Sequence, residues 1–115
     1  MRVIVAGSID FPAGTEGELL RMAKPLIDAA YEEPGCIHYV WTIDPSKPGR
    51  VWVYEEWESS ETLIAHLAGE PYLRMSDHLK ACGILGADVA KYRIDRMEPI
   101  YDGTGVPRGD FADAG

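Results

Sequence analysis

His66 is the side chain of this sequence best suited to acid–base chemistry, because an imidazole titrates near neutral pH. It lies between Leu63 and Leu67 in a stretch with helical apolar spacing, so its ring should project onto an apolar surface. An imidazole in such a place can accept a proton from a phenol or an enol, and we predict that His66 is a general base. Alternatively, His66 caps the edge of a core and bonds a backbone carbonyl.

Aromatic and apolar residues near this histidine in the sequence could bind a flat ring. Trp57 ends a predicted strand and Tyr72 lies on the following helical stretch, and we expect the two to form a ring-binding wall. Leu63 and Met75 lie on the apolar stripes of two predicted helices and complete the predicted substrate site. Glu55 shares a strand face with Trp57, so its carboxylate either points into the pocket or is buried in a pair. Packing in an ordinary core is the competing interpretation for Trp57 and Tyr72.

The secondary structure that must position these residues follows from apolar periodicity. Alternation and β-branched residues predict strands over residues 2–10, 36–44, 51–58 and 88–97. Spacing of three to four predicts helices over residues 16–31, 60–68 and 71–82. Thr15 and Glu18 predict a capping box for the first helix, and Ser59 or Ser60 should cap the second. The order is that of the ferredoxin-like split βαβ fold, an α+β fold with a four-stranded antiparallel sheet.

The chain length of 115 residues indicates one domain, which we place at residues 1–97. Residues 98–115 are rich in Pro, Gly and Asp and predict an irregular C-terminal tail, or an arm laid on a partner. Helices should cover one face of the sheet. The other face would carry apolar residues, among them Ile4, Ala6, Trp52 and Tyr54, which is too much to leave in water. We therefore predict a homodimer that packs through this sheet face.

The overall charge limits the kinds of partner. The formal net charge is −8 and the eleven Lys and Arg residues form no basic run, which disfavours nucleic acid and anionic membranes. No apolar stretch approaches the roughly 18 residues of a membrane span. Cys36 and Cys82 lack the spacing of a metal site, and we expect free thiols in a reducing cytoplasm. A cytoplasmic protein without a metal site is the expectation.

Several short motifs occur together in this chain. They are Glu33-Pro34-Gly35-Cys36, Tyr39, Asp44-Pro45, Glu55-x-Trp57-Glu58-Ser59 and His66-Leu67. In this order and spacing, they resemble the antibiotic biosynthesis monooxygenase family over roughly residues 2–95. The resemblance implies a dimeric α+β barrel. It also implies kinship with small oxygenases that use no metal, flavin or haem and act on quinols and polyketide anthrones. The same family includes haem degraders and an isomerase of a signalling sugar phosphate.

Branches of that family differ at a few positions. The polyketide oxygenases have Asn and Tyr where this chain has Val53 and Leu63. The haem degraders have Asn where this chain has Gly7 and Trp where it has His66, and their axial histidine would fall at Ser76. The resemblance is therefore to the quinol-oxygenase-like branch, in which a histidine at position 66 is common.

Together these observations predict a cofactor-independent monooxygenase that oxidises a flat, ionisable aromatic with O₂. The substrate would be a quinol or a polyphenol, and it would itself supply the electrons. Two alternatives remain open. The protein could be a non-catalytic dimeric binder of a hydrophobic small molecule, or a keto–enol isomerase that shuttles a proton through His66.

Overall fold

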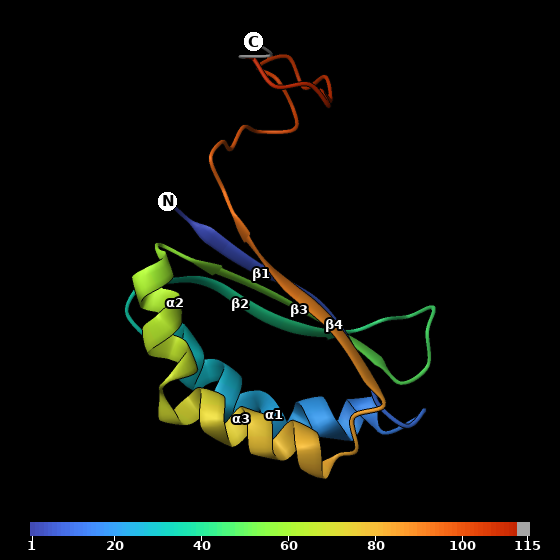
Figure 1. The fold of residues 1–115 in the computed structure, drawn as a ribbon. Helices are drawn as coiled ribbons and strands as arrows, with labels where there is room; N and C mark the ends of the chain where they lie inside the picture. The colour runs from blue at the N-terminus through green and yellow to red at the C-terminus, as the bar shows by residue number, and fades with distance from the viewer. Residues whose placement is uncertain (113–115) are drawn as a thin grey trace.

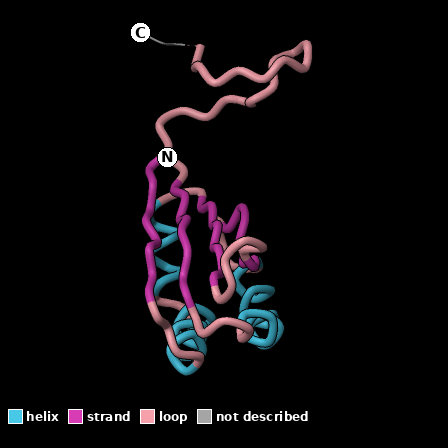
Figure 2. Tube along the Cα trace, turned by 90° about the vertical axis from the view of Figure 1, so that its right-hand side faces the viewer, coloured by secondary structure: helices cyan, strands magenta, loops and turns pink. Residues whose placement is uncertain are grey.

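The computed structural model describes residues 1–112, which form a four-stranded antiparallel sheet with three helices on one of its faces (Figures 1 and 2). This confirms the predicted order of elements and the ferredoxin-like α+β fold. In chain order the elements are β1 (Val3–Asp10), α1 (Glu16–Tyr31), β2 (Cys36–Ile43), β3 (Arg50–Trp57), α2 (Ser60–Leu67), α3 (Glu70–Ala81) and β4 (Gly86–Arg93).

The strands are arranged in the order β2-β3-β1-β4, so β2 and β4 are the edges. One row of residues crosses all four strands. Val5 of β1 pairs with Glu55 of β3 on one side and with Lys91 of β4 on the other. Glu55 in turn pairs with Tyr39 of β2. Directly opposed residues of antiparallel strands project from the same face, so these four side chains lie on one face of the sheet.

The last strand differs from the prediction, which placed it at residues 88–97. It begins at Gly86 and ends at Arg93, the residue opposite Val3. Since β1 starts at Val3, the chain beyond Ile94 finds no strand to pair with, although its sequence still alternates. Figure 1 shows the following segment leaving the sheet. Within residues 98–112 the one bridge joins Tyr101 to Pro107, and residues 113–115 of the predicted tail lie outside the described residues.

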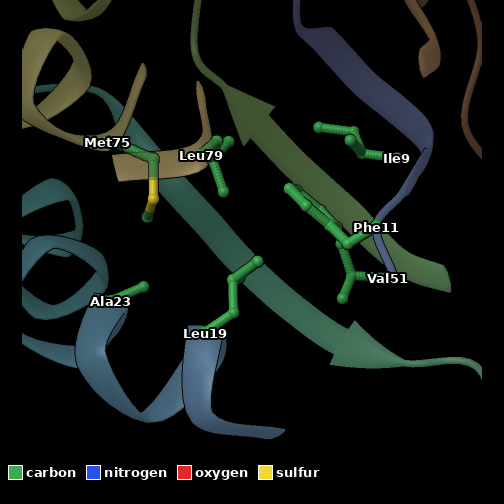
Figure 3. Close-up of a cluster of buried hydrophobic side chains, with 7 residues drawn as sticks. All are labelled: Ile9, Phe11, Leu19, Ala23, Val51, Met75 and Leu79. Carbon is green, nitrogen blue, oxygen red and sulfur yellow. The ribbon is translucent and has the colours of Figure 1, made fainter. Parts of the chain in front are cut away.

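The core lies between the sheet and the helices because each contributes an apolar face. Leu19 and Ala23 of α1 and Met75 and Leu79 of α3 point toward the strands (Figure 3). They pack with three residues of β1, β3 and the turn after β1, namely Ile9, Val51 and Phe11. A second buried cluster lies at the other end of the paired strands β1 and β3. It consists of Val3, Ala30, Tyr39, Trp57 and Leu63.

The start of α2 confirms the predicted cap, whereas the capping box predicted for α1 is wrong. Ser59 is extended and accepts a hydrogen bond from the Thr62 N–H, and Thr62 accepts one from the Ser59 N–H. Thr15 instead has helical backbone angles, and its hydroxyl donates to the Pro12 carbonyl at 2.7 Å. Glu18 is likewise diverted into an ion pair with Arg21. Neither side chain is then available to cap the backbone.

The sheet face away from the helices exposes large apolar side chains. Trp52 is 42% exposed and Tyr54 36% exposed on β3, and Val40 and Tyr92 on the edge strands are exposed too. Glu56 is buried on this face, where it accepts hydrogen bonds from Arg2 and from the Tyr54 hydroxyl. In residues 1–112, no helix combines the length and apolar character needed to span a membrane.

Candidate functional site

A cavity of about 400 Å³ lies between the sheet and the helices α2 and α3. This volume falls within the range of small-molecule sites. Apolar side chains from both layers form much of its wall. The residues that line it are Val5, Ile9, Tyr39, Trp41, Val53, Glu55, Leu63, Leu67, Tyr72, Met75, Ser76, Leu79, Ile84, Val89, Ala90 and Lys91.

Four residues that the sequence places in a substrate site line this cavity. Glu55 lies on the sheet side, and Leu63, Tyr72 and Met75 project from α2 and α3. They come together because β3 turns its odd-numbered side chains toward the helices, while the apolar stripes of α2 and α3 face the sheet. The arrangement forms a largely apolar cavity with one carboxyl group in its wall.

His66 and Trp57 lie behind that wall. The His66 side chain is 1% exposed and the indole of Trp57 is completely buried. The two rings overlap, with centroids 4.5 Å apart and planes inclined by 30°. Neither ring lines the cavity.

Carboxylates approach both nitrogens of the His66 ring. Nδ1 lies 3.0 Å from Oε2 of Glu33, within hydrogen-bond distance. Nε2 lies 3.8 Å from Oε1 of Glu55 and has no hydrogen-bond partner, although it is fully buried. An ionised Glu33 can only accept, so Nδ1 carries the hydrogen and Nε2 of the neutral ring is a free acceptor. The imidazole therefore faces two carboxylates in place of the backbone carbonyl of the alternative interpretation.

Glu33 reaches His66 through a tight turn. Gly35 adopts φ +80°, which favours glycine, and a Cβ there would lie 2.4 Å from the Thr62 side chain. The Gly35 carbonyl also accepts a hydrogen bond from the Glu58 N–H at 2.9 Å. These contacts hold the turn against the start of α2, and so bring Glu33 to a histidine 33 residues away. The Glu-Pro-Gly turn is the signal in the sequence that could have indicated this contact.

Glu55 is the carboxyl group that connects His66 to the cavity. Glu55 is 7% exposed, and Oε1 of its side chain accepts a hydrogen bond from the Trp57 indole at 3.0 Å. Burial raises the pKa of Glu55, and the hydrogen bond from Trp57 opposes that rise only in part. A carboxyl group with a raised pKa is a stronger base than an ordinary one, so Glu55 is suited to take a proton from a ligand.

Two tyrosines complete the surroundings of the imidazole. The rings of Tyr39 and Tyr72 contact the His66 ring edge-on, and their centroids lie 5.4 and 5.6 Å from its centroid. Both also line the cavity. Burial raises the pKa of Tyr39 far above its usual value, so its phenol stays protonated. Tyr39, Glu33 and Lys91 were not among the predicted site residues.

The cysteines and the acidic groups do not form a metal site in the described part of the chain. Both Cys36 and Cys82 are free thiols, and burial raises the pKa of Cys36 to about 11. Within residues 1–112, no group of three or more His, Cys, Asp or Glu side chains is placed to hold a metal ion.

Comparison with known proteins gives the same architecture. The sequence model of the antibiotic biosynthesis monooxygenase family matches residues 2–78. A proposed antibiotic biosynthesis monooxygenase from Deinococcus radiodurans superposes with a TM-score of 0.77 at 24% identity, covering 85% of this chain and 97% of its own. A conserved protein from Methanosarcina mazei gives 0.73 at 22% identity, covering 81% and 92%. These two likenesses establish the fold alone. None of the curated proteins matches this sequence.

Proposed function

Because this chain belongs to the antibiotic biosynthesis monooxygenase family, we propose that it is a cofactor-independent monooxygenase acting with O₂ on a flat, ionisable aromatic such as a quinol or polyphenol. One observation carries this proposal. A buried carboxyl group with a raised pKa, Glu55, lines an apolar cavity, and an imidazole with a free Nε2 lies behind it. These two groups can remove the proton of a bound phenol in a cavity that is shielded from water.

The electrons that reduce O₂ then come from the substrate. Glu55 takes the proton of a ring hydroxyl, and the resulting electron-rich anion transfers one electron to O₂. The substrate radical and superoxide combine at a ring carbon to give a hydroperoxide, which loses water and leaves a carbonyl. For a quinol the balance is quinol + O₂ → hydroxyquinone + H₂O. The substrate provides all four electrons, two from oxidation to the quinone and two from the C–H bond that is replaced.

His66, the predicted general base, acts in this proposal through Glu55. Nε2 of the imidazole is 3.8 Å from Oε1 of the carboxyl group, so a small movement of either side chain makes a hydrogen bond. The proton can then pass to the imidazole, whose charge is stabilised by Glu33 at 3.0 Å and by the face of the Trp57 ring. His66 is thus a positioning residue and proton store, and Glu55 is the group that touches the substrate.

Oxygen consumption tests the function directly. Purified protein with a panel of benzoquinols, naphthoquinols and polyphenols, in the presence of a chelator, should consume one O₂ per substrate and form no hydrogen peroxide. A keto–enol isomerase would change the substrate without consuming O₂. A binding protein would show saturable affinity and no turnover. Either result would reject the oxygenase.

Replacing His66 with Gln should shift the pH dependence of turnover. Once the proton has passed from Glu55 to His66, the positive charge of the imidazole favours the ionised carboxylate and so lowers the pKa of Glu55. Loss of the imidazole should therefore move the acid limb of kcat/KM to higher pH. We expect a loss of turnover at neutral pH that becomes smaller as the pH rises. Lys80→Gln is the control, because Lys80 is exposed on α3 and does not line the cavity. A uniform loss at all pH values would indicate damaged packing and contradict this role.

We also propose that two chains associate through the sheet face opposite the helices. The exposed Trp52 and Tyr54 of β3 and Tyr92 of β4 support this, since a second copy of the same face would remove them from water. The dimeric barrel implied by the family resemblance has the same arrangement. Sedimentation velocity at micromolar concentration should show a dimer, and a monomer alone would reject the association.

A further inference from the structure

Lys91 places a positive charge on the same row of the sheet as Glu55. Val5 lies between them and pairs with both, so the two residues are separated by two strand spacings. Neighbouring strands lie about 4.8 Å apart, which puts their Cα atoms about 10 Å apart. Both side chains project from the helix-covered face and both line the cavity. The cavity floor thus has a carboxyl group near its buried end and an ammonium group at its edge.

The surroundings of Lys91 make this charge available. Seven of the eleven Lys and Arg residues form ion pairs with acidic side chains within residues 1–112. Lys91 is exposed and is not one of the seven, although the chain carries nineteen acidic residues. Of the described residues that line the cavity, Lys91 is the one that carries a positive charge.

We infer that Lys91 selects an aromatic substrate bearing a carboxylate, and that it holds this group at the mouth of the cavity while the ionisable hydroxyl faces Glu55. The inference rests on the proposed function and specifies its substrate class. A bicyclic hydroxy acid spans a distance of the order of the separation that the strand spacing gives. The two charged residues then fix the direction in which the ring enters.

The electrostatics of the whole chain favour this arrangement. With a net charge of −8, the protein repels an anionic ligand at long range, and a local cation is needed to hold one. A carboxylate bound at the exposed edge keeps part of its hydration, so it avoids the cost of full burial. The apolar ring meanwhile enters the dry part of the cavity, where Leu63 and Met75 lie.

Calorimetry on the full-length protein under argon, where oxidation cannot proceed, tests the inference with two probes. These are 6-hydroxy-2-naphthoate, whose hydroxyl and carboxylate lie at opposite ends of the bicycle, and its neutral carboxamide. The wild-type protein should bind the carboxylate about tenfold more tightly, as expected for one charge-assisted hydrogen bond at an exposed site. Lys91→Gln should abolish this preference and Lys91→Arg should retain it. Lys80→Gln, which removes a charge from the exposed end of α3, should leave it unchanged.

The outcomes separate this inference from the proposed function. Equal affinity for both probes, no binding of either, or a preference that survives in Lys91→Gln would overturn the role of Lys91. Oxygen uptake, measured separately in air, reports on the oxygenase. A carboxylate preference that depends on Lys91 without oxygen uptake would support the substrate class and reject the oxygenase. Oxygen uptake together with equal affinity for the acid and the amide would support the oxygenase and reject the substrate class.

Discussion

Replacing Glu55 with Gln should lower kcat/KM for an active quinol by about 100- to 10,000-fold, the usual contribution of a general base. The amide oxygen of Gln can still accept the hydrogen bond from the Trp57 indole, so the wall of the cavity should keep its shape. What the variant loses is the ability to take a proton. Stopped-flow or oxygen-electrode rates at several pH values measure the effect, and wild-type activity should rise with pH through the raised pKa of Glu55.

The same substitution should make the protein more stable at neutral pH. Because burial raises the pKa of Glu55, the folded protein holds this proton more tightly than the unfolded chain does. The free energy of unfolding therefore falls as pH rises from the ordinary carboxyl pKa through the raised one. Gln carries no charge and avoids this loss, so the gain in melting temperature over wild type should grow as the pH rises from the ordinary carboxyl pKa through the raised pKa of Glu55.

Glu58→Gln is the matched control for Glu55→Gln. Glu58 lies three residues further along, just after the end of β3, and is exposed. Its replacement should change neither turnover nor the pH dependence of stability. A folded Glu55→Gln protein that kept wild-type turnover would show that the proton acceptor lies elsewhere, and the role of Glu55 as the base would be rejected.

Replacing Gly7 with Ala should destabilise the fold by about 3 kcal/mol, as expected for overpacking against rigid atoms. A Cβ at this position would lie 2.0 Å from the carbonyl oxygen of Asp88 and 2.6 Å from the Cα of Val89. Both are backbone atoms of β4, so no side chain can rotate away. The strand would have to shift, and with it the part of the cavity wall formed by β4. Urea denaturation followed by circular dichroism measures the change.

Gly17→Ala reverses the sign of that effect and serves as its control. Gly17 lies in α1, and a Cβ there would meet nothing within 4 Å. Alanine is about 1 kcal/mol more favourable than glycine in a helix interior, so this variant, in the first turn of α1, should be more stable than wild type by up to about that amount. A Gly7→Ala protein as stable as wild type, or more stable, would disprove the close contact between β1 and β4 at Gly7.

Much of the fold could be predicted because its elements bury one face each. The stripe of α1 and the alternation of β3 identify their inward sides, and Leu19, Val51 and Val53 are buried as that pattern requires. Local polar contacts were harder to predict. The sequence around Thr15 fits a capping box well, but the hydroxyl donates to the Pro12 carbonyl instead. Such a choice depends on the path of the preceding turn, which periodicity does not describe.

The site illustrates a second limit. Alternation places Glu55 and Trp57 on one face of β3, but it does not say how deep each side chain lies. Glu55 lines the cavity, whereas Trp57 is covered by the His66 ring. The contact between His66 and Glu33 spans 33 residues and depends on the turn at Gly35. Depth and distant partners are properties of the assembled packing, so they could be identified only in the structure.

The row of Tyr39, Glu55, Val5 and Lys91 belongs to a single polypeptide, as do the imidazole and the carboxylate behind it. In a dimer, each chain would therefore contain a complete site. Inactivating one copy should leave its neighbour working at full speed, and a mixed pair should retain half of the original rate. We therefore expect neither alternation between the two sites nor cooperativity in substrate binding.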